Sequence, residues 1–388
     1  MGHGGRSARG AFVPAGTVPR IAKSRPGYPR ASRKEKALRR MRGVRLAAGL
    51  FALGIGLASC ASDTQPGGDG GTSGAPAPST VKVGLAYDIG GRGDQSFNDS
   101  AARGLDKAKS EFGVEVTELE AAQGETDAQK EDRLRQLAES GHNVIIAVGF
   151  AYEKALSAAA ADYPEAKFAI IDSAAPEAAN VANLTFAEHE GSFLVGVVAG
   201  LKSKTGNVGF IGGVNTPLIQ KFEVGFEQGV KAVKPDATVQ VKYLTQPPDF
   251  TGFNDPAKGT TAANGMLDAG ADVIYPAAGG SGAGAFEAAK AKGAMGIGVD
   301  SDQYNLPALA NVKDVIITSM VKNVDVAVYD FIKAVKDGQF KSGLQVYDLA
   351  SGGVSFATSG GKIDDIVPQV EEYKEKIVSG EIQVKDTK

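Results

Sequence analysis

The sequence predicts an α/β protein whose folded part forms two lobes, each built around a parallel β-sheet. From residue 81 onward, short apolar runs alternate with amphipathic helical stretches, and this alternation is typical of parallel sheets with helices on both faces. We count ten such runs, more than one ordinary doubly wound sheet holds. The chain has 388 residues, 43% of them apolar, and so it can bury two hydrophobic cores.

The predicted elements follow one another with Gly-containing turns between them. Strands are expected near residues 81–87, 114–119, 143–148, 167–172, 181–186, 207–211, 238–243, 272–276, 295–299 and 314–319. Helices are expected near residues 98–112, 126–140, 151–162, 190–203, 217–234, 256–269, 281–291 and 321–336.

The chain is expected to cross between the lobes several times. The first lobe ends near Phe186, a strongly apolar helix begins the second, and the segment near 314–344 looks like a return to the first. We therefore assign residues 81–187 and 316–344 to the first lobe, and residues 188–315 and 345–388 to the second. The crossings between them form a hinge.

Three segments precede the folded part. Residues 41–59 combine a basic start, an apolar run of about fourteen residues and a small-residue end, which indicates a secretory signal too short for a confident membrane span. Residues 60–80 are rich in Gly, Pro, Ser and Thr, as in a flexible tether. Residues 1–40 hold 11 Lys and Arg without apolar periodicity. We expect them to be a disordered extension, with translation starting at Met41.

Cys60 is the only cysteine, and it follows Leu57, Ala58 and Ser59. This run resembles the bacterial lipobox, in which the cysteine is acylated and becomes the first residue of the mature protein. Two acyl chains suffice for stable anchoring, so we expect a lipid-anchored protein outside the cytoplasm, attached to the bacterial cell membrane. A buried cysteine after an uncleaved helix is the alternative.

Charge and motif content argue against nucleic-acid binding and catalysis. Residues 60–388 carry 29 Lys and Arg against 44 Asp and Glu, a net charge of −15, which repels nucleic acids and anionic membranes. The sequence has no Gly-x-Ser-x-Gly elbow and no P-loop. His142 and His189 are too few for a typical histidine metal site. We expect no catalytic residue, metal or cofactor.

The first candidate binding site is the stretch 87–98, Tyr-Asp-Ile-Gly-Gly-Arg-Gly-Asp-Gln-Ser-Phe-Asn, which follows a predicted strand and opens a helix. Open α/β sheets bind ligands at such places. Its glycines let the backbone approach a ligand, its polar residues supply hydrogen bonds, and Phe97 offers a flat apolar face. This mixture suits a polar ligand that carries a ring. A connecting loop without a ligand is the alternative, and a dinucleotide fingerprint is disfavoured because Ser96 stands where a glycine is needed.

Eight motifs occur in order along residues 81–335. The first is Asp88-(x5)-Asp94-Gln-Ser-Phe-Asn98, and the others lie at 190–196, 225–229, 253–259, 270–273, 278–280, 298–303 and 318–325. Together they resemble the basic membrane protein family, the PnrA-like substrate-binding lipoproteins of ABC importers. The resemblance implies a type I periplasmic-binding-protein fold, two Rossmann-like lobes that close on a purine nucleoside. It also implies delivery of the nucleoside to an ABC permease with its ATPase, by a monomeric protein.

The resemblance assigns four positions to the nucleobase. Phe97 and Phe253 would sandwich the base, and Asn98 and Asp172 would hydrogen-bond its edge. The stretch ahead of Phe253 is longer than the motif, so Phe250 is a possible substitute.

Four further positions are assigned to the sugar. Asp88, Asp300 and Lys322 would hold ribose hydroxyls or orient one another, near the Gly279 backbone. Asp172 and Asp300 each end an apolar run, where helix N-capping is the alternative role. Lys322 opens a predicted helix, an unfavourable place for a cation, so a carboxylate or ligand partner is expected.

Other interpretations concern neighbouring residues and related functions. Phe222 and Phe226, four apart on a predicted helix, are assigned to the core. A sugar-binding protein or a signalling receptor of the same fold is the alternative function. A DNA-binding regulator would need an N-terminal helix-turn-helix where the signal segment stands.

Overall fold

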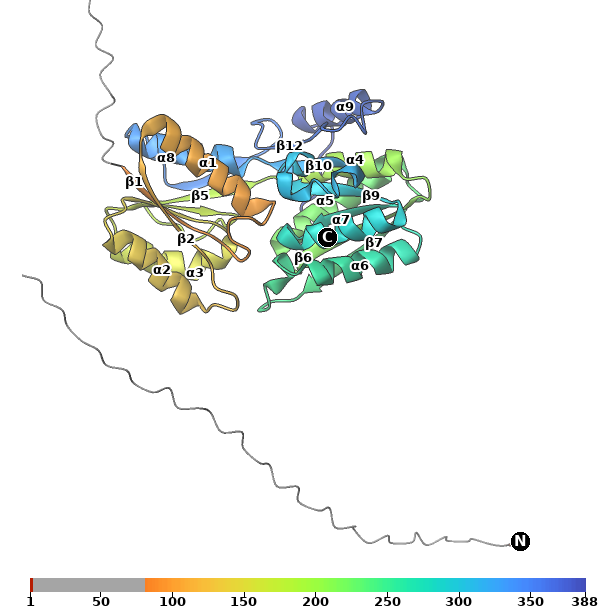
Figure 1. The fold of residues 1–388 in the computed structure, drawn as a ribbon, viewed down its shortest axis with the longest axis horizontal. Coiled ribbons are helices and arrows are strands. Elements are labelled where there is room, and N and C mark those ends of the chain that lie inside the picture. Colours follow the sequence, from red (N-terminus) through yellow and green to blue (C-terminus); the bar gives the residue numbers. More distant parts are fainter. Residues whose placement is uncertain (3–80) are drawn as a thin grey trace, which may run out of the picture. The chain divides into compact units, whose positions relative to one another are not determined.

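The computed structural model describes residues 1–2 and 81–388. The predictions for the extension, the signal segment, Cys60 and the tether therefore lie outside the described residues. Residues 81–388 contain two six-stranded sheets, and Figure 1 shows each sheet between layers of helices. The predicted α/β class with two parallel-sheet lobes is confirmed.

The first lobe is an entirely parallel sheet with two helices on each face. Its strand order is β11-β5-β4-β3-β1-β2. The strands are β1 (Lys82–Ala86), β2 (Glu115–Leu119), β3 (Val144–Ala147), β4 (Lys167–Ile171), β5 (Val181–Phe186) and β11 (Gly343–Tyr347). Helices α1 (Phe97–Phe112) and α8 (Val324–Lys336) cover one face, and α2 (Asp127–Glu139) and α3 (Glu153–Asp162) cover the other (Figure 1).

Local sequence explains these elements. All four residues of β3 are buried, as expected for a central parallel strand covered on both faces. Helix α2 begins at a capping box between Thr126 and Gln129. Helix α1 approaches α8 closely at Gly104, where a Cβ atom would lie 2.3 Å from the Asp325 carbonyl oxygen.

The second lobe has the same layers around a sheet of order β12-β10-β9-β8-β6-β7. Its strands are β6 (Asn207–Val214), β7 (Thr238–Thr245), β8 (Val273–Ala277), β9 (Met295–Asp300), β10 (Ile316–Lys322) and the antiparallel β12 (Val354–Phe356). Its helices are α4 (Glu188–Lys202) packed on α5 (Pro217–Val233), α6 (Pro256–Asp268) packed on α7 (Gly282–Lys292), and α9 (Val367–Val378) beside α4.

The crossings between the lobes differ from the prediction. Strand β10 pairs in parallel with β9 in the second sheet, so the chain returns to the first lobe after Lys322 and not at residue 316. It remains there through β11, which pairs with β5 up to Tyr347, so the second lobe does not resume at residue 345. A short apolar run is equally compatible with either buried sheet, and only the pairing register shows which sheet it joins.

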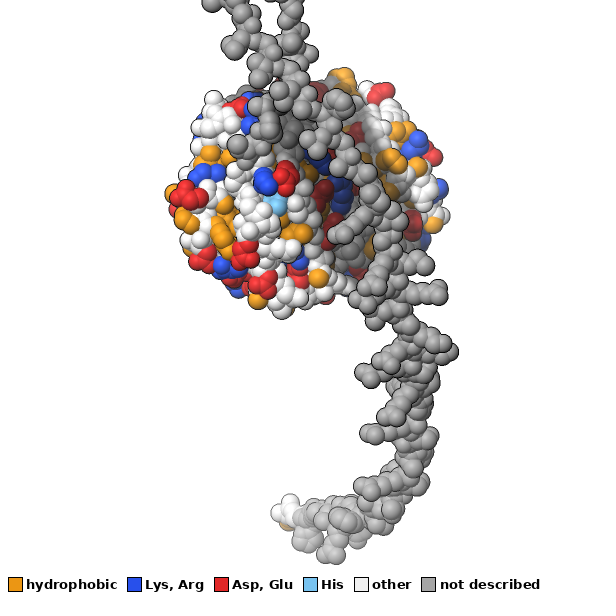
Figure 2. All heavy atoms as spheres, turned by 60° about the vertical axis from the view of Figure 1, so that its left-hand side comes forward, with side chains coloured by type: hydrophobic (Ala, Val, Ile, Leu, Met, Phe, Trp, Pro, Cys, Tyr) orange, Lys and Arg blue, Asp and Glu red, His pale blue; other side chains and the backbone are white. Residues whose placement is uncertain are grey.

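Three elements were not predicted: β11, β12 and α9. Strand β11 exposes Leu344 and Val346, and β12 is three residues long, so neither carries a strong apolar signal. Among the helices that the structure describes, none is both long and apolar enough to cross a bilayer. Figure 2 shows acidic and basic side chains mixed with apolar ones over the face in view.

Candidate ligand-binding site

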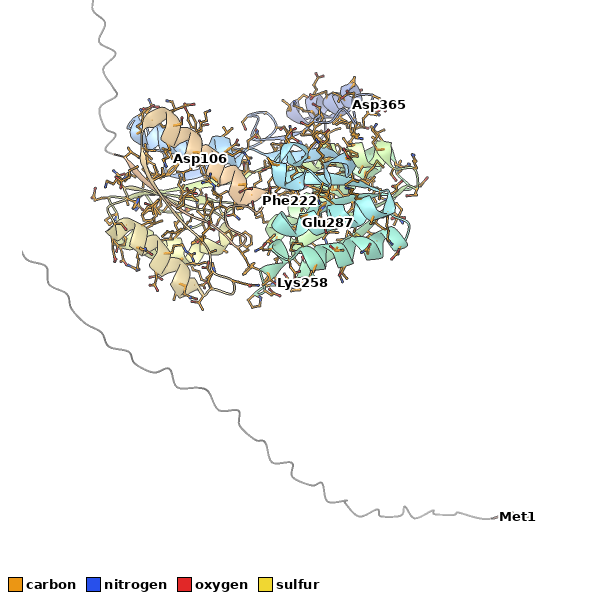
Figure 3. The ribbon with its side chains drawn as sticks, in the orientation of Figure 1. Met1, Asp106, Phe222, Lys258, Glu287 and Asp365 are labelled. Atoms are coloured by element: carbon orange, nitrogen blue, oxygen red, sulfur yellow. The ribbon has the colours of Figure 1, made fainter. Side chains whose placement is uncertain are left out.

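A cavity, partly open to solvent, lies between the lobes. It is lined from the first lobe by the loops after β1, β3 and β4, and from the second by α5 and the ends of β8, β9 and β10. Figure 3 labels Phe222 of α5 where the second lobe faces the first. All eight residues that the sequence singled out line this cavity, namely Asp88, Phe97, Asn98, Asp172, Phe253, Gly279, Asp300 and Lys322.

The loop between β1 and α1 is held by Asp94. Its carboxylate accepts hydrogen bonds from the backbone N–H groups of Ser96 at 2.9 Å, Asn98 at 2.8 Å and Asp99 at 3.1 Å. These N–H groups belong to the first turn of α1, which has no intrahelical acceptors. Burial raises the pKa of Asp94 to about 6, although the three backbone donors lower it. Asp94 therefore shapes the loop.

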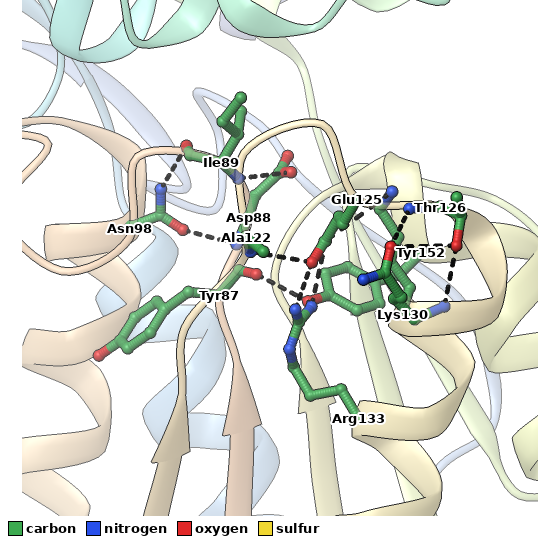
Figure 4. A network of polar contacts seen from close by, with 11 residues as sticks. Tyr87, Asp88, Ile89, Asn98, Ala122, Glu125, Thr126, Lys130, Arg133 and Tyr152 are labelled. Carbon is green, nitrogen blue, oxygen red and sulfur yellow. Dashed lines mark hydrogen bonds and ion pairs between the residues drawn. The ribbon is translucent and has the colours of Figure 1, made fainter. Parts of the chain in front are cut away.

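The side chain of Asn98 is hydrogen-bonded within the same loop (Figure 4). Its Oδ1 accepts from the Asp88 N–H at 3.0 Å, and its Nδ2 donates to the Ile89 carbonyl at 3.3 Å and to Asp94 Oδ2 at 3.0 Å. Both amide hydrogens are thus used within the protein. The remaining capacity of this side chain is one lone pair on Oδ1.

A cluster of buried charged side chains surrounds Lys322 at the cavity. Its side chain is 1% exposed, and its Nζ lies 2.6 Å from Asp172 Oδ2 and 3.2 Å from Glu188 Oε1. Burial by itself lowers the pKa of Lys322, but Asp172, Glu188 and Asp300 outweigh it and raise the pKa. The expected carboxylate partners are present, but Lys322 ends β10 and does not start a helix.

The carboxyl groups of Asp172 and Asp300 are shielded from water, and Asp88 is half-buried. Burial raises the pKa of Asp88 to about 7 and that of Asp172 to about 6. It also raises the pKa of Asp300, whose carboxylate accepts a hydrogen bond from the Ser96 hydroxyl at 2.6 Å and so joins the two lobes. Asp172 Oδ1 is buried and has no hydrogen-bond partner within the described chain, so it is a free acceptor beside the cavity.

Two of these aspartates occupy an uncommon backbone conformation. The φ angles of Asp172 and Asp300 are +68° and +61°, in the left-handed region that side chains other than glycine rarely adopt. Neither residue is the N-cap of a helix, so the capping alternative is wrong for both. Such strain tends to persist where a side chain must point at a functional site.

Aromatic rings reach the cavity from both lobes. Phe97 comes from the start of α1, and Phe253 from a 3-10 turn (Thr251–Phe253) of the second lobe. Phe250 does not line the cavity. Its ring packs edge-on against Phe150 of the first lobe, with centroids 5.9 Å apart. The longer stretch before Phe253 therefore does not make Phe250 its substitute in the cavity wall.

Among the residues at this site that sequence reasoning did not assign to it, Phe222 and Glu188 bear most on its chemistry. Phe222 lines the cavity and its ring centre lies 5.5 Å from Lys322 Nζ, whereas Phe226, one turn later, is fully buried in the core. Phe222 belongs to the buried core, as assigned, and it also lines the cavity, a second role that the spacing of four residues could not show. Glu188 is fully buried beside Lys322, with Oε2 3.6 Å from Lys221 Nζ. No motif had indicated it.

Residues 80–388 match the family of PnrA-like ABC transporter substrate-binding proteins. The chain belongs to this family. A CD4+ T-cell-stimulating antigen of Listeria innocua is 36% identical, over 86% of this chain and 96% of that protein. The nucleoside-binding protein BmpA of a Lactococcus lactis ABC transporter is 34% identical, over 84% of this chain and 94% of that protein. An uncharacterised lipoprotein of Pyrococcus furiosus is also 34% identical, over 84% of each chain.

Solved structures agree with the fold. An ABC transporter solute-binding protein from Aeropyrum pernix is 33% identical, with a TM-score of 0.68 over 78% of this chain and 92% of that one. The lac repressor, at 12% identity and a TM-score of 0.51 over 71% of this chain and 80% of that one, shares the fold alone. The PnrA-like chain thus has the type I periplasmic-binding-protein fold. It is the solute-binding component of an ABC transporter, a family that binds substrates without catalysis and works with a permease.

Proposed function

We propose that the cavity binds a nucleoside, most favourably a purine nucleoside, and that the protein delivers it to the permease. The observation that carries this proposal is that both lobes contribute phenylalanine rings and carboxylates to the same cavity. A nucleoside offers a flat π-face, a polar base edge and vicinal hydroxyls, which match these groups. The nucleoside-binding relative from Lactococcus lactis supports the same ligand class.

In this proposal the base lies between Phe97 and Phe253. Asp172 faces the base edge with its free Oδ1, and Asn98 offers only the lone pair that its loop contacts leave. Stacking tolerates every base, so discrimination between purines rests on these few polar groups. We expect affinities for different purine nucleosides to lie within about tenfold of one another.

The ribose lies at Asp88 and Asp300, with Lys322 orienting the carboxylates and the Gly279 backbone nearby. When a ligand without the sugar binds, these groups lose the hydrogen bonds that the hydroxyls would make. Each group left unpaired weakens binding by about 1–3 kcal/mol. Free bases should therefore bind much more weakly than nucleosides.

Isothermal titration of residues 81–388 with adenosine, inosine, adenine, ribose and glucose tests the proposal. We expect binding of both nucleosides, and at least tenfold weaker binding of adenine. Binding of glucose without binding of either nucleoside would identify a sugar-binding protein and overturn the proposal. Equal affinity for adenine and adenosine would overturn the placement of the ribose.

We propose further that acylated Cys60 anchors the protein to the outer face of the bacterial cell membrane. The lipobox-like sequence before Cys60 and the lipoprotein relative from Pyrococcus furiosus support this anchor. Residues 60–80 would then act as a tether that lets a monomeric body present its ligand to the permease and its ATPase.

A further inference from the structure

A second hollow adjoins the ligand cavity. Asp88 and Ile89 line both spaces, and the hollow is partly open to solvent. Its remaining walls are the segment 122–125, Lys130 and Ala151 from the first lobe and residues 248–251 from the second. A ligand group that extends past Asp88 therefore enters this hollow.

The first-lobe wall of the hollow is held in place by a buried polar network (Figure 4). Arg133 forms an ion pair with Glu125, with Nη1 3.1 Å from Oε1, and also hydrogen-bonds the Tyr152 hydroxyl. The Tyr152 hydroxyl donates to the Tyr87 carbonyl at 2.7 Å, and the Ala122 N–H donates to Glu125 Oε2 at 3.0 Å. The network connects the loop before α2 to the end of β1. Within it, the charges of Glu125 and Arg133 are paired with each other.

Lys130 makes only a long contact with this network. Its side chain is 9% exposed, yet its only ion pair among the described residues is with Glu125 Oε1, at 3.8 Å, too long for a hydrogen bond. Within the described part of the chain its ammonium donates no hydrogen bond. Its nitrogen is not among the fully buried unpaired atoms of the described residues, and it lines the solvent-open hollow beside Asp88, so water reaches it. A ligand oxygen in the hollow would replace this water as the acceptor of a hydrogen bond from Lys130.

We propose that the hollow is a subsite for the exocyclic hydroxymethyl group of the sugar, with Lys130 donating a hydrogen bond to its oxygen. The inference rests on the proposed nucleoside function, which puts the sugar at Asp88. Of the ribose hydroxyls, the 5′-hydroxyl alone sits on a carbon outside the ring, so it reaches past Asp88 while the ring hydroxyls stay beside it.

The charges around the hollow favour an uncharged oxygen over a phosphate. Glu125 and Arg133 neutralise each other, which leaves Lys130 facing the carboxylates of Asp88 and Asp249. Hydrogen bonds from the Thr251 hydroxyl and N–H lower the pKa of Asp249, so that this group stays ionised. A phosphate dianion would be repelled by Asp249 and by the ionised fraction of Asp88, whose pKa is about 7.

Titration of the wild-type protein with adenosine, 5′-deoxyadenosine and adenosine 5′-monophosphate is the first test. We expect 5′-deoxyadenosine to bind about tenfold to a hundredfold more weakly than adenosine, because hydrogen bonds to a charged group are strong. The monophosphate should bind more weakly than adenosine. Equal affinities for the two uncharged nucleosides, or tighter binding of the monophosphate, would overturn the subsite. A protein that binds no nucleoside would instead overturn the proposed function itself.

The Lys130→Met variant provides the second test. Adenosine should lose the same ten- to hundredfold in affinity, and the difference between adenosine and 5′-deoxyadenosine should vanish. Lys154→Met is the matched control, since Lys154 lies on α3 of the same lobe with an 84% exposed side chain, and both affinities should stay unchanged. If Lys130→Met weakens both nucleosides equally, Lys130 positions Asp88 and does not bind the ligand, which contradicts the proposal. The wild-type comparison stands even where the variant folds poorly.

Discussion

Replacing Lys322 with Met should destabilise the folded protein strongly, because the change leaves buried carboxylates without their cation. Lys322 Nζ lies 2.6 Å from Asp172 Oδ2 and 3.2 Å from Glu188 Oε1, and all three side chains are almost completely shielded from water. Removing one partner of a buried ion pair costs about 3–5 kcal/mol. For a domain of this size each kcal/mol lowers the melting temperature by about 2–4 °C. We therefore expect a fall of about 6–20 °C at pH 8.

The loss of stability in Lys322→Met should depend on pH. Burial raises the pKa of Asp172 to about 6, against the lowering influence of Lys322, so loss of Lys322 raises it further. A carboxyl whose pKa is higher in the folded state stabilises the fold fully below its ordinary pKa, and this contribution is lost as the pH rises through the folded-state pKa. Both proteins hold Asp172 protonated near pH 5. The difference between their melting temperatures should therefore be largest at pH 8 and should shrink toward pH 5.

Thermal melts of the wild type and variant at pH 5 and pH 8, followed by circular dichroism, measure these differences. Lys333→Met is the control, because Lys333 is 49% exposed and its loss should shift the melting temperature by less than about 2 °C. Adding Asp172→Asn to Lys322→Met should restore part of the stability, since asparagine tolerates the φ of +68° at this position. A fall of less than 2 °C at pH 8, or the same fall at both pH values, would refute the reasoning.

Three further changes test the pocket, the lobe packing and the anchor. Asp300→Asn should reduce the preference for adenosine over adenine by about tenfold or more in titrations; an unchanged ratio would remove Asp300 from the ribose site. Gly229→Ala should cost more than about 2 kcal/mol in urea unfolding, because the new Cβ would lie 2.0 Å from the Phe193 carbonyl oxygen. Gly265→Ala, where a Cβ meets nothing within 4 Å, should be neutral or stabilising, and equal losses in both variants would contradict this account of α4–α5 packing. Cys60→Ser should release the protein from the membrane fraction at unchanged ligand affinity, and its retention there after a high-salt wash would argue against the lipid anchor.

The class of fold, the family and most of the proposed site residues could be predicted from the amino-acid sequence. Alternating strand and helix patterns predicted two parallel-sheet lobes, and the order of the motifs identified the family that the comparisons show. Turn residues and apolar runs also located most elements to within a few residues, because these signals are local. The motifs even selected eight residues that prove to line a single cavity.

The contacts between distant segments and side chains could not be predicted and became visible in the three-dimensional structure. Strand β10 joins the second sheet, and Phe222 reaches the cavity while Phe226 stays in the core. Local periodicity records which face of an element is shielded from water, but it does not record whether a neighbouring strand, a core or a ligand cavity covers that face.

The same limit applies to the polar residues. Asn98 carries the right chemistry for a base edge, yet its amide hydrogens serve its own loop. Glu188 and Lys130 had drawn no attention. Tertiary packing makes Glu188 the partner of Lys322, and it leaves Lys130 without a hydrogen bond to any other described residue. The energy of a charged group depends on its burial and partners, and those are set by residues that are distant in the sequence.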